Sequence, residues 1–141
     1  MIRGVIRIFN KILIGIDESE ESLKAAKRVI EIQKGYEGEV IAFHSTQHRK
    51  SESDAVDNED HSKKVFTEVE KLFKEANISF ETRLIVDQDA EDYITNIVEK
   101  ENINLVVLGY NGKHGIIKRR ILGSIPTQVM NNVLCDVLIV K

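Results

Sequence analysis

A glycine-rich, basic connection from Gly109 to Ser124 holds the residue types that are best suited to binding an anion. It follows the apolar run INLVVLG and contains Gly109, Gly112, Gly115 and Gly123. Glycine lets backbone N–H groups approach a ligand closely, and Ser124 with Pro126 predicts the start of a helix, where a phosphate is stabilised. The connection also carries the basic side chains Lys113, His114, Lys118, Arg119 and Arg120. These side chains suit contact with phosphates and suit a solvated loop equally well.

The spacing of these glycines excludes two common phosphate motifs. A P-loop requires G-x-x-x-x-G-K-[ST], which the chain lacks, and the dinucleotide fingerprint G-x-G-x-x-G follows the first strand of its domain. Here the glycines follow the fourth expected strand. In a parallel sheet, ligands bind beyond the carboxyl ends of the strands where the winding reverses, so the position still favours a ligand site.

The remaining reactive side chains do not assemble into a recognisable catalytic pattern. Asp17 follows the first expected strand, where a carboxylate also suits the start of the next helix. His44 lies at a strand end and is expected to be a hydrogen-bonded structural residue. His48 and His61 have no Cys/His cluster around them, so we expect no zinc site, and Cys135 is expected to be a small buried side chain.

The elements that must position these residues are visible in the hydrophobic pattern. Short apolar runs predict parallel strands that are covered on both faces: Ile12–Ile16, Val40–Phe43, Leu105–Leu108 and Val137–Val140. Residues Phe80–Val86 alternate, with charges at Glu81 and Arg83, and so predict an edge strand.

Helical periodicity separates these strands. It predicts helices over residues 19–33, 57–76, 89–102 and 124–132, the first with Ser19 as N-cap. The polar stretch Ser45–Asp60 is expected to be a solvated loop that leads into the second helix. The alternation of strand and helix predicts an α/β fold, a three-layer sandwich around a five-stranded, mainly parallel sheet.

Composition and charge indicate an ordinary globular domain spanning residues 1–141. Of the residues, 42% are hydrophobic and 30% are charged, and the net charge of -3 gives no reason to expect nucleic acid or an anionic membrane as a partner. A single cysteine cannot form an intramolecular disulfide, which suits a reducing cytoplasm. The opening MIRGVIRIF is too short and too charged for a signal-peptide core or membrane span. We expect a soluble, cytoplasmic protein.

Together, KILIGIDESEESLKAAKRVIEI, VIAFHS and LVVLGYNGKHGIIKRRILGSIPTQVMNNVLCDVLIV resemble the universal stress protein family, and specifically its ATP-binding branch. The resemblance extends from Lys11 to Val140. It implies the strand order 3-2-1-4-5 of a Rossmann-like fold similar to the adenine nucleotide alpha hydrolases. It also implies ATP as the ligand, with Mg²⁺ on its phosphates.

The residues that would form the site follow from the same resemblance. Asp17 would lie near the ribose and the phosphate-bound metal, and the backbone of Ser45 would border the adenine. The implied set of nucleotide-binding residues is Ile16, Asp17, Ser45, Leu108, Gly109, Gly112, Lys113, Gly123, Ser124 and Ile125.

The sequence departs from the family's G-x2-G-x9-G-[ST] motif at one place. Ten residues, 113–122, separate Gly112 from Gly123. The extra residue can bulge outwards or displace the phosphate cradle. Two functions therefore stay open: an ATP-dependent stress-response or signalling module, and a dimeric family member that binds no nucleotide and acts through protein interactions. No general base is placed to attack a γ-phosphate, so we expect a binding module with at most slow hydrolysis.

Two further expectations concern partners and chemistry. The apolar last strand, Val137–Val140, would lie at a sheet edge and pair with its copy in a homodimer. A phospho-acceptor domain built on Asp17, Glu18, Asp87 and Lys141 is the other class of function considered, although it leaves the glycine-rich connection unexplained.

Overall fold

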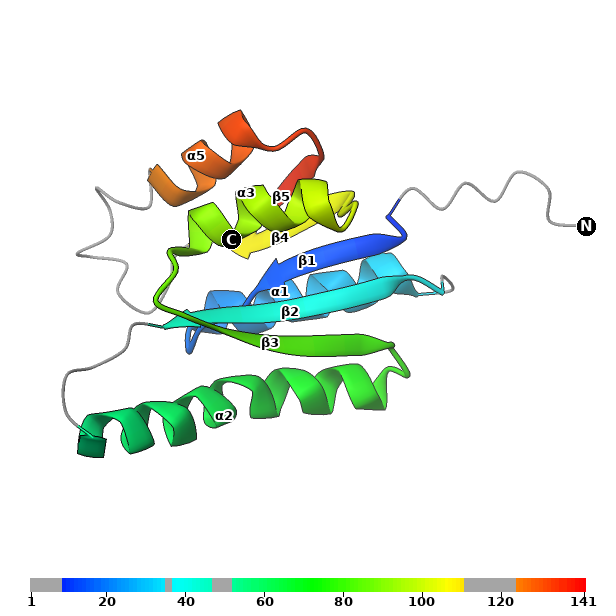
Figure 1. The fold of residues 1–141 in the computed structure, drawn as a ribbon. Coiled ribbons are helices and arrows are strands. Elements are labelled where there is room, and N and C mark those ends of the chain that lie inside the picture. Colours follow the sequence, from blue (N-terminus) through cyan, green and yellow to red (C-terminus); the bar gives the residue numbers. More distant parts are fainter. Residues whose placement is uncertain (1–8, 35–36, 47–51, 111–123) are drawn as a thin grey trace, which may run out of the picture.

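The computed structural model describes residues 9–34, 37–46, 52–110 and 124–141; for 52–62 and 124–126 it describes the backbone. Five parallel strands form one sheet in the order β3-β2-β1-β4-β5. The strands are β1 (Lys11–Gly15), β2 (Glu39–Thr46), β3 (Phe80–Val86), β4 (Leu105–Gly109) and β5 (Asp136–Val140). The helices between them are α1 (Glu20–Gln33), α2 (Glu52–Glu75), α3 (Ala90–Lys100) and α5 (Ser124–Asn132). The predicted fold class and strand order are thereby confirmed (Figure 1).

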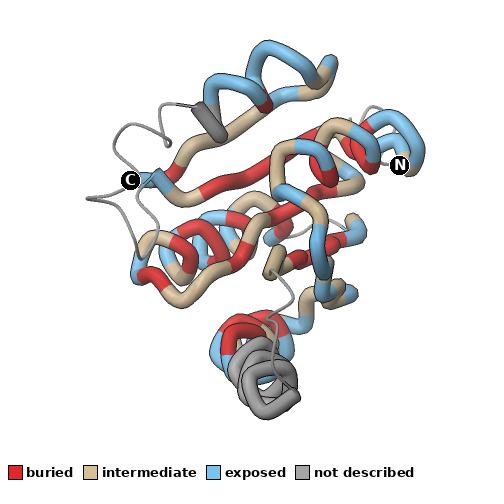
Figure 2. The backbone as a smooth tube through the Cα atoms, turned by 60° about the vertical axis from the view of Figure 1, so that its left-hand side comes forward, coloured by how far each residue is buried: buried red, intermediate tan, exposed pale blue. Residues whose placement is uncertain are grey.

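Two hydrophobic clusters, one on each face of the sheet, hold the layers together. Helices α1 and α2 cover one face, and α3 and α5 cover the other. Because β1 lies in the middle, its side chains alternate between the clusters: Ile12 and Ile14 face α1 and α2, whereas Leu13 faces α3 and α5. All three are fully buried. Figure 2 shows long buried stretches through the middle of the molecule, where the central strands lie, and buried and exposed stretches alternating along the helices.

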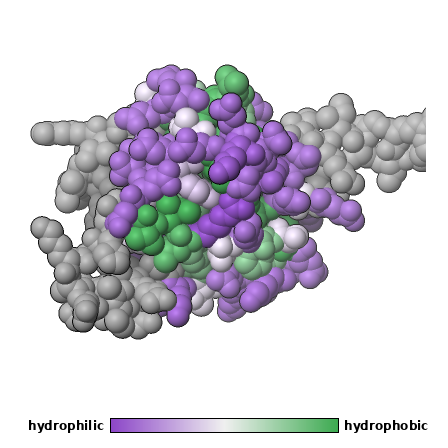
Figure 3. Space-filling model, viewed as in Figure 1, coloured by the Kyte–Doolittle hydropathy of each residue, from purple (hydrophilic) through white to green (hydrophobic). Residues whose placement is uncertain are grey.

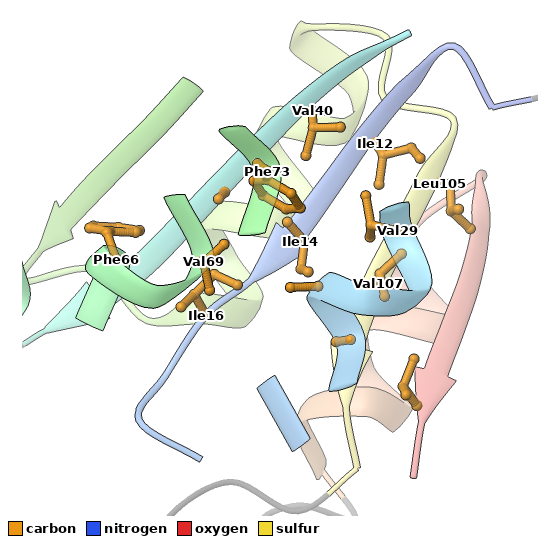
Figure 4. Packing of buried hydrophobic residues seen from close by; sticks show 14 of the residues in the cluster. Ile12, Ile14, Ile16, Val29, Val40, Phe66, Val69, Phe73, Leu105 and Val107 are labelled. Atoms are coloured by element: carbon orange, nitrogen blue, oxygen red, sulfur yellow. The ribbon is translucent and has the colours of Figure 1, made fainter. Parts of the chain in front are cut away.

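The cluster under α1 and α2 contains the phenylalanine side chains of α2. Phe73 of α2 is fully buried and packs against Phe80, their ring centroids 5.4 Å apart. Figure 4 shows Phe66, Val69 and Phe73 of α2 lying over β1 and β2, with Val29 of α1 beside β1 and β4. Burying such a side chain contributes about 1.5–3 kcal/mol relative to leaving it exposed. The sequence predicted both helices from their periodicity, and each lays its apolar side against the sheet.

Strand ends and one helix start differ from the sequence prediction. Strand β2 runs on to Thr46, and α2 begins at Glu52 rather than near Asp57. The expectation that Ser45–Asp60 forms a loop is therefore wrong for all but residues 47–51, which lie outside the described part of the chain. Acidic residues are stabilised in the first turns of a helix by its dipole, so an acid-rich stretch suits a helix start as well as a loop.

Strand β3 lies at the edge of the sheet, as its alternating pattern predicted. Arg83 forms a bidentate ion pair with Glu101, which follows α3, at 2.6 and 2.9 Å, and a third bond to Glu81 at 2.9 Å. These bonds raise the pKa of Arg83 and lower the pKa of Glu101. Figure 3 shows hydrophobic surface along this edge, where Leu84 and Val86 are exposed. The charges on the other face of the strand discourage further pairing.

Candidate functional site

The switch point of the sheet lies at the carboxyl ends of β1 and β4. The chain leaves β1 towards α1 on one face and leaves β4 towards α5 on the other face. Since α5 begins at Ser124 and leads back to the start of β5, its amino end lies at this same edge of the sheet. β1 and β4 are paired in the sheet, but the connections after them part to opposite faces, and this is where open parallel sheets generally bind ligands.

Asp17 is fixed by a short network of hydrogen bonds in the β1–α1 turn. Its Oδ1 accepts the backbone N–H of Ser19 at 2.8 Å and the Ser19 hydroxyl. The Asp17 N–H donates to Oγ of Ser22 at 2.9 Å, and the Ser22 N–H donates to Oγ of Ser19 at 3.1 Å. Ser19 is the N-cap of α1, as predicted, and Asp17 is held in one orientation beside it. The part played by Ser22 had no signal in the sequence beyond its distance from the cap.

Gly109 lies directly against the first turn of α1. A Cβ at this position would come within 3.0 Å of the carbonyl carbon and of Cβ of Glu21, and within 3.1 Å of its carbonyl oxygen. A side chain at this position would require its neighbours to give by a few tenths of an ångström, and the nearest atoms belong largely to backbone, which yields less easily than a side-chain end. The first glycine of the predicted motif thus permits the close packing of β4 against α1, beside the Asp17 turn.

Ser45 and Leu108 lie at the same edge of the sheet. Ser45 ends β2 together with Thr46, and its hydroxyl donates to the carbonyl of Gln88 at 2.5 Å, which ties β2 to the β3–α3 turn. Leu108 is buried next to Gly15, whose absent Cβ would lie 3.0 Å from Leu108 Cδ2. The structure thus brings the predicted residues Ile16, Asp17, Ser45, Leu108 and Gly109 to one edge, with the backbone of Ser124 and Ile125 starting α5.

Three residues of the predicted site, Gly112, Lys113 and Gly123, lie outside the described part of the chain, as do His114 and the basic residues 118–120. Tyr110, which sequence reasoning did not single out, lies at the described end of β4. Its N–H donates to Val140 at 2.8 Å, and the ammonium group of Lys141 lies 5.0 Å from its ring centroid.

The two helix starts at this edge differ in charge. Helix α1 carries Glu20 and Glu21 in its first turn, whereas the first turn of α5 carries no acidic residue. Carboxylates already complement the positive end of α1, so an anionic ligand would be repelled there and stabilised at α5. An anion is therefore best accommodated at the start of α5.

The phospho-acceptor arrangement is not assembled. Asp87 follows β3, and β2 separates that strand from β1 and Asp17. Within the described residues there is no cluster of three or more His, Cys, Asp or Glu side chains that could hold a metal ion. In the same part of the chain, no helix combines the length and apolar character that crossing a bilayer requires.

A parallel sheet with the strand order 3-2-1-4-5, in which the connections after β1 and β4 run to opposite faces, defines a Rossmann-like α/β protein. The sequence profile of the universal stress protein family matches residues 9–141, and the chain therefore belongs to this family. It is 29% identical, over 150 residues, to Universal stress protein MJ0531 of Methanocaldococcus jannaschii, a match that covers 100% of this chain and 87% of that protein.

Solved structures share the fold. Hypothetical protein MJ0577 superposes with a TM-score of 0.78 and 25% identity, covering 95% of this chain and 96% of its own. A universal stress protein in complex with cAMP gives a TM-score of 0.74 and 23% identity, covering 95% and 98%. A family member from Archaeoglobus fulgidus in complex with dAMP gives 0.72 and 16%, covering 95% and 99%. One from Arabidopsis thaliana with AMP bound gives 0.66 and 13%, covering 94% and 91%.

Proposed function

We propose that this protein binds adenine nucleotides at the carboxyl edge of the sheet, between β1 and β4, and that ATP with Mg²⁺ is the full ligand. The observation that carries the proposal is the close approach of Gly109 to Glu21 beside the fixed Asp17 turn. It provides a rigid rim at the switch point of the sheet. The complexes of similar folds with cAMP, dAMP and AMP support an adenine nucleotide as the ligand class.

The ligand's parts are assigned by the chemistry of each region. Adenine would lie beside the backbone of Ser45, and the ribose beside Asp17 and Gly109. The phosphates would lie at the start of α5, near Gly112, Lys113, Gly123, Ser124 and Ile125. Because cAMP, dAMP and AMP share an adenine, a sugar and one phosphate, that common part is expected to provide most of the affinity.

Asp17 is the residue proposed to face the metal. Mg²⁺ usually keeps several waters and is held by one or two carboxylates together with substrate phosphates. Asp17 offers a carboxylate of which Oδ1 is engaged by Ser19, so it would supply a single oxygen through Oδ2. This fits a metal that is bound mainly by phosphate. The proposal is for a nucleotide-dependent binding module in the cytoplasm, with hydrolysis slow at most.

The partner proposed for β5 is a second copy of the chain. Strand β5 is an edge of the sheet; Asp136 is exposed, Val137–Ile139 are partly buried and Val140 is buried. Leu134, which precedes it, is fully exposed, and Met130 of α5 is half exposed. Pairing of two β5 strands would cover this edge. Light scattering on the purified protein tests it, because a monomer at micromolar concentration would contradict the homodimer.

The alternative function is a dimeric universal stress protein that binds no nucleotide and acts through protein contacts. The extra residue between Gly112 and Gly123 favours it, since a displaced cradle would not hold the phosphates.

Titration calorimetry with nucleotide-free protein decides between the two functions. AMP, ATP and ATP with Mg²⁺ are titrated into the wild type and into Gly123→Val. Micromolar binding of ATP that is weakened in the variant supports the proposal. No binding of any nucleotide at millimolar concentration, with the dimer intact, would leave the alternative. Binding of AMP and ATP with equal affinity, unaffected by the variant, would support an adenosine site without a phosphate cradle.

A further inference from the structure

The hydrogen-bond ladder between β1 and β2 ends in an unusual way. Its last pair is Gly15 with Phe43, and the Ile16 N–H still donates to the carbonyl of Phe43 at 2.8 Å. In a parallel ladder every second residue of a strand directs its backbone groups to the same neighbour. Since Phe43 faces β1, Ser45 also directs its N–H towards the β1 side. One more ladder bond would therefore join the Ser45 N–H to the Ile16 carbonyl.

A side chain takes the place of that bond. His44 Nδ1 lies 2.8 Å from the Ile16 carbonyl oxygen. A carbonyl oxygen only accepts hydrogen bonds, so Nδ1 of His44 carries the proton and donates. Among the described residues no hydrogen bond joins Ser45 N–H to Ile16, and the register ends one residue before the pair that such a bond would create.

The neighbours of His44 hold this arrangement in place. Its ring meets Phe66 of α2 edge-on, with the planes at 89° and the centroids 6.3 Å apart. On the other side of β2, the Asp87 N–H donates to the Thr46 carbonyl at 2.9 Å, and the Ser45 hydroxyl donates to Gln88. The end of β2 is therefore fixed against β3, while the Ser45 N–H is directed to the β1 side, past the last paired residue of β1.

We propose that His44 is a positioning residue for nucleotide binding: by occupying the Ile16 carbonyl, its imidazole keeps the Ser45 N–H free to donate to a ring nitrogen of the adenine. The inference rests on the proposed function for the identity of the ligand. The observation that the His44 side chain takes the place of a backbone ladder bond does not depend on which ligand binds. The bond from His44 to Ile16 lies where the end of β1, which leads into the Asp17 turn, adjoins the end of β2, which would border the base.

Three variants of His44 separate a positioning role from simple packing. In His44→Asn the amide nitrogen stands where Nδ1 stands, so the bond to Ile16 is kept. In His44→Gln the amide nitrogen stands one bond further out, and in His44→Phe the donor is lost while the ring against Phe66 is kept. Only the Asn variant is therefore expected to behave like the wild type.

Amide hydrogen exchange in the nucleotide-free protein is the first readout. Loss of the imidazole donor lets the Ser45 N–H complete the ladder, so exchange at Ser45 is expected to slow about tenfold or more in the Phe and Gln variants. A variant that merely loosened the fold would speed exchange instead. Unchanged or faster exchange at Ser45 in His44→Phe would overturn the inference.

AMP titration is the second readout. Affinity is expected to fall roughly three- to tenfold in the Phe and Gln variants and to return in the Asn variant, the size of one hydrogen bond. Equal affinity in the wild type and His44→Phe would overturn the inference while leaving the proposed function intact. If the wild type binds no AMP, the proposed function fails, and the exchange rate of Ser45 alone then decides whether His44 holds the strand ends apart.

Discussion

Replacing Gly109 by alanine tests whether the close approach of β4 to α1 is required. The new methyl group would lie 3.0 Å from the carbonyl carbon and from Cβ of Glu21. Such distances are well inside ordinary van der Waals contact, and the helix backbone cannot rotate away as a side-chain end can. The substitution must therefore push the start of α1, with Glu21 and the neighbouring Asp17 turn, away from the end of β4.

Gly15→Ala is the matched control. The residue lies at the end of the adjacent strand, and its nearest neighbour is also at 3.0 Å, but this neighbour is the terminal Cδ2 of Leu108. A methyl group at the end of a leucine can move by rotating one torsion. Neither Gly109 nor Gly15 has a positive φ, so alanine is compatible with the backbone at both positions.

The expected magnitudes follow from two opposing effects. Overpacking against fixed atoms costs about 1–3 kcal/mol, whereas exchanging glycine for alanine stabilises by about 0.4–1 kcal/mol through the unfolded chain. Gly109→Ala is therefore expected to lose about 1–2 kcal/mol of unfolding free energy. Gly15→Ala, in which Leu108 can yield, is expected to stay within about 0.5 kcal/mol of the wild type.

Urea unfolding followed by circular dichroism measures both changes, with an unchanged m-value as the condition for comparing them. AMP affinity measured in parallel is expected to fall in Gly109→Ala alone, because only this variant displaces the Asp17 turn. The reasoning is refuted if Gly109→Ala is as stable as the wild type, or if Gly15→Ala loses as much as Gly109→Ala.

Three further predictions concern other parts of the fold. Gln33 is buried, and its amide donates to the carbonyl of Phe9 and accepts the N–H of Gly38. Gln33→Met leaves both backbone groups without this partner and is expected to lower the free energy of unfolding in urea by about 2–3 kcal/mol. A loss below about 0.5 kcal/mol would contradict this. Arg83 lowers the pKa of Glu101 in the folded protein. The ion pair therefore stabilises the fold fully at pH values above about 4.3, the pKa of a glutamate in the unfolded chain. This stabilisation is lost as the pH falls through the lower pKa of the folded state. Glu101→Gln should thus cost about 1 kcal/mol near neutral pH and almost nothing in strong acid, and a cost independent of pH would argue against the ion pair. Cys135, which the sequence predicted to be buried, is only partly buried. This partial burial still raises the pKa of its thiol, so iodoacetamide should modify it more slowly in the folded protein than in urea, and equal rates would contradict the prediction.

The sequence by itself determined the order and type of the elements. Continuous apolar runs such as Leu105–Leu108 identify strands that are covered on both faces, and the alternation in Phe80–Val86 identifies an edge. Ser19 could be named as the N-cap of α1 because a serine oxygen before a helical period satisfies the first free N–H groups. The sequence also indicated where in the fold a site is expected, since ligands bind at the carboxyl edge where the winding reverses and Gly109 ends β4 at that edge.

The tertiary structure alone decided which atoms meet at that edge. Glycine at position 109 signalled close approach, but the sequence could not name Glu21 as the neighbour, because the contact joins elements far apart in the chain. The early start of α2 was missed because acidic residues suit both a solvated loop and a helix start. The bond from His44 to Ile16 depends on where the β1–β2 ladder stops, and the register of two strands is fixed only when the whole sheet packs.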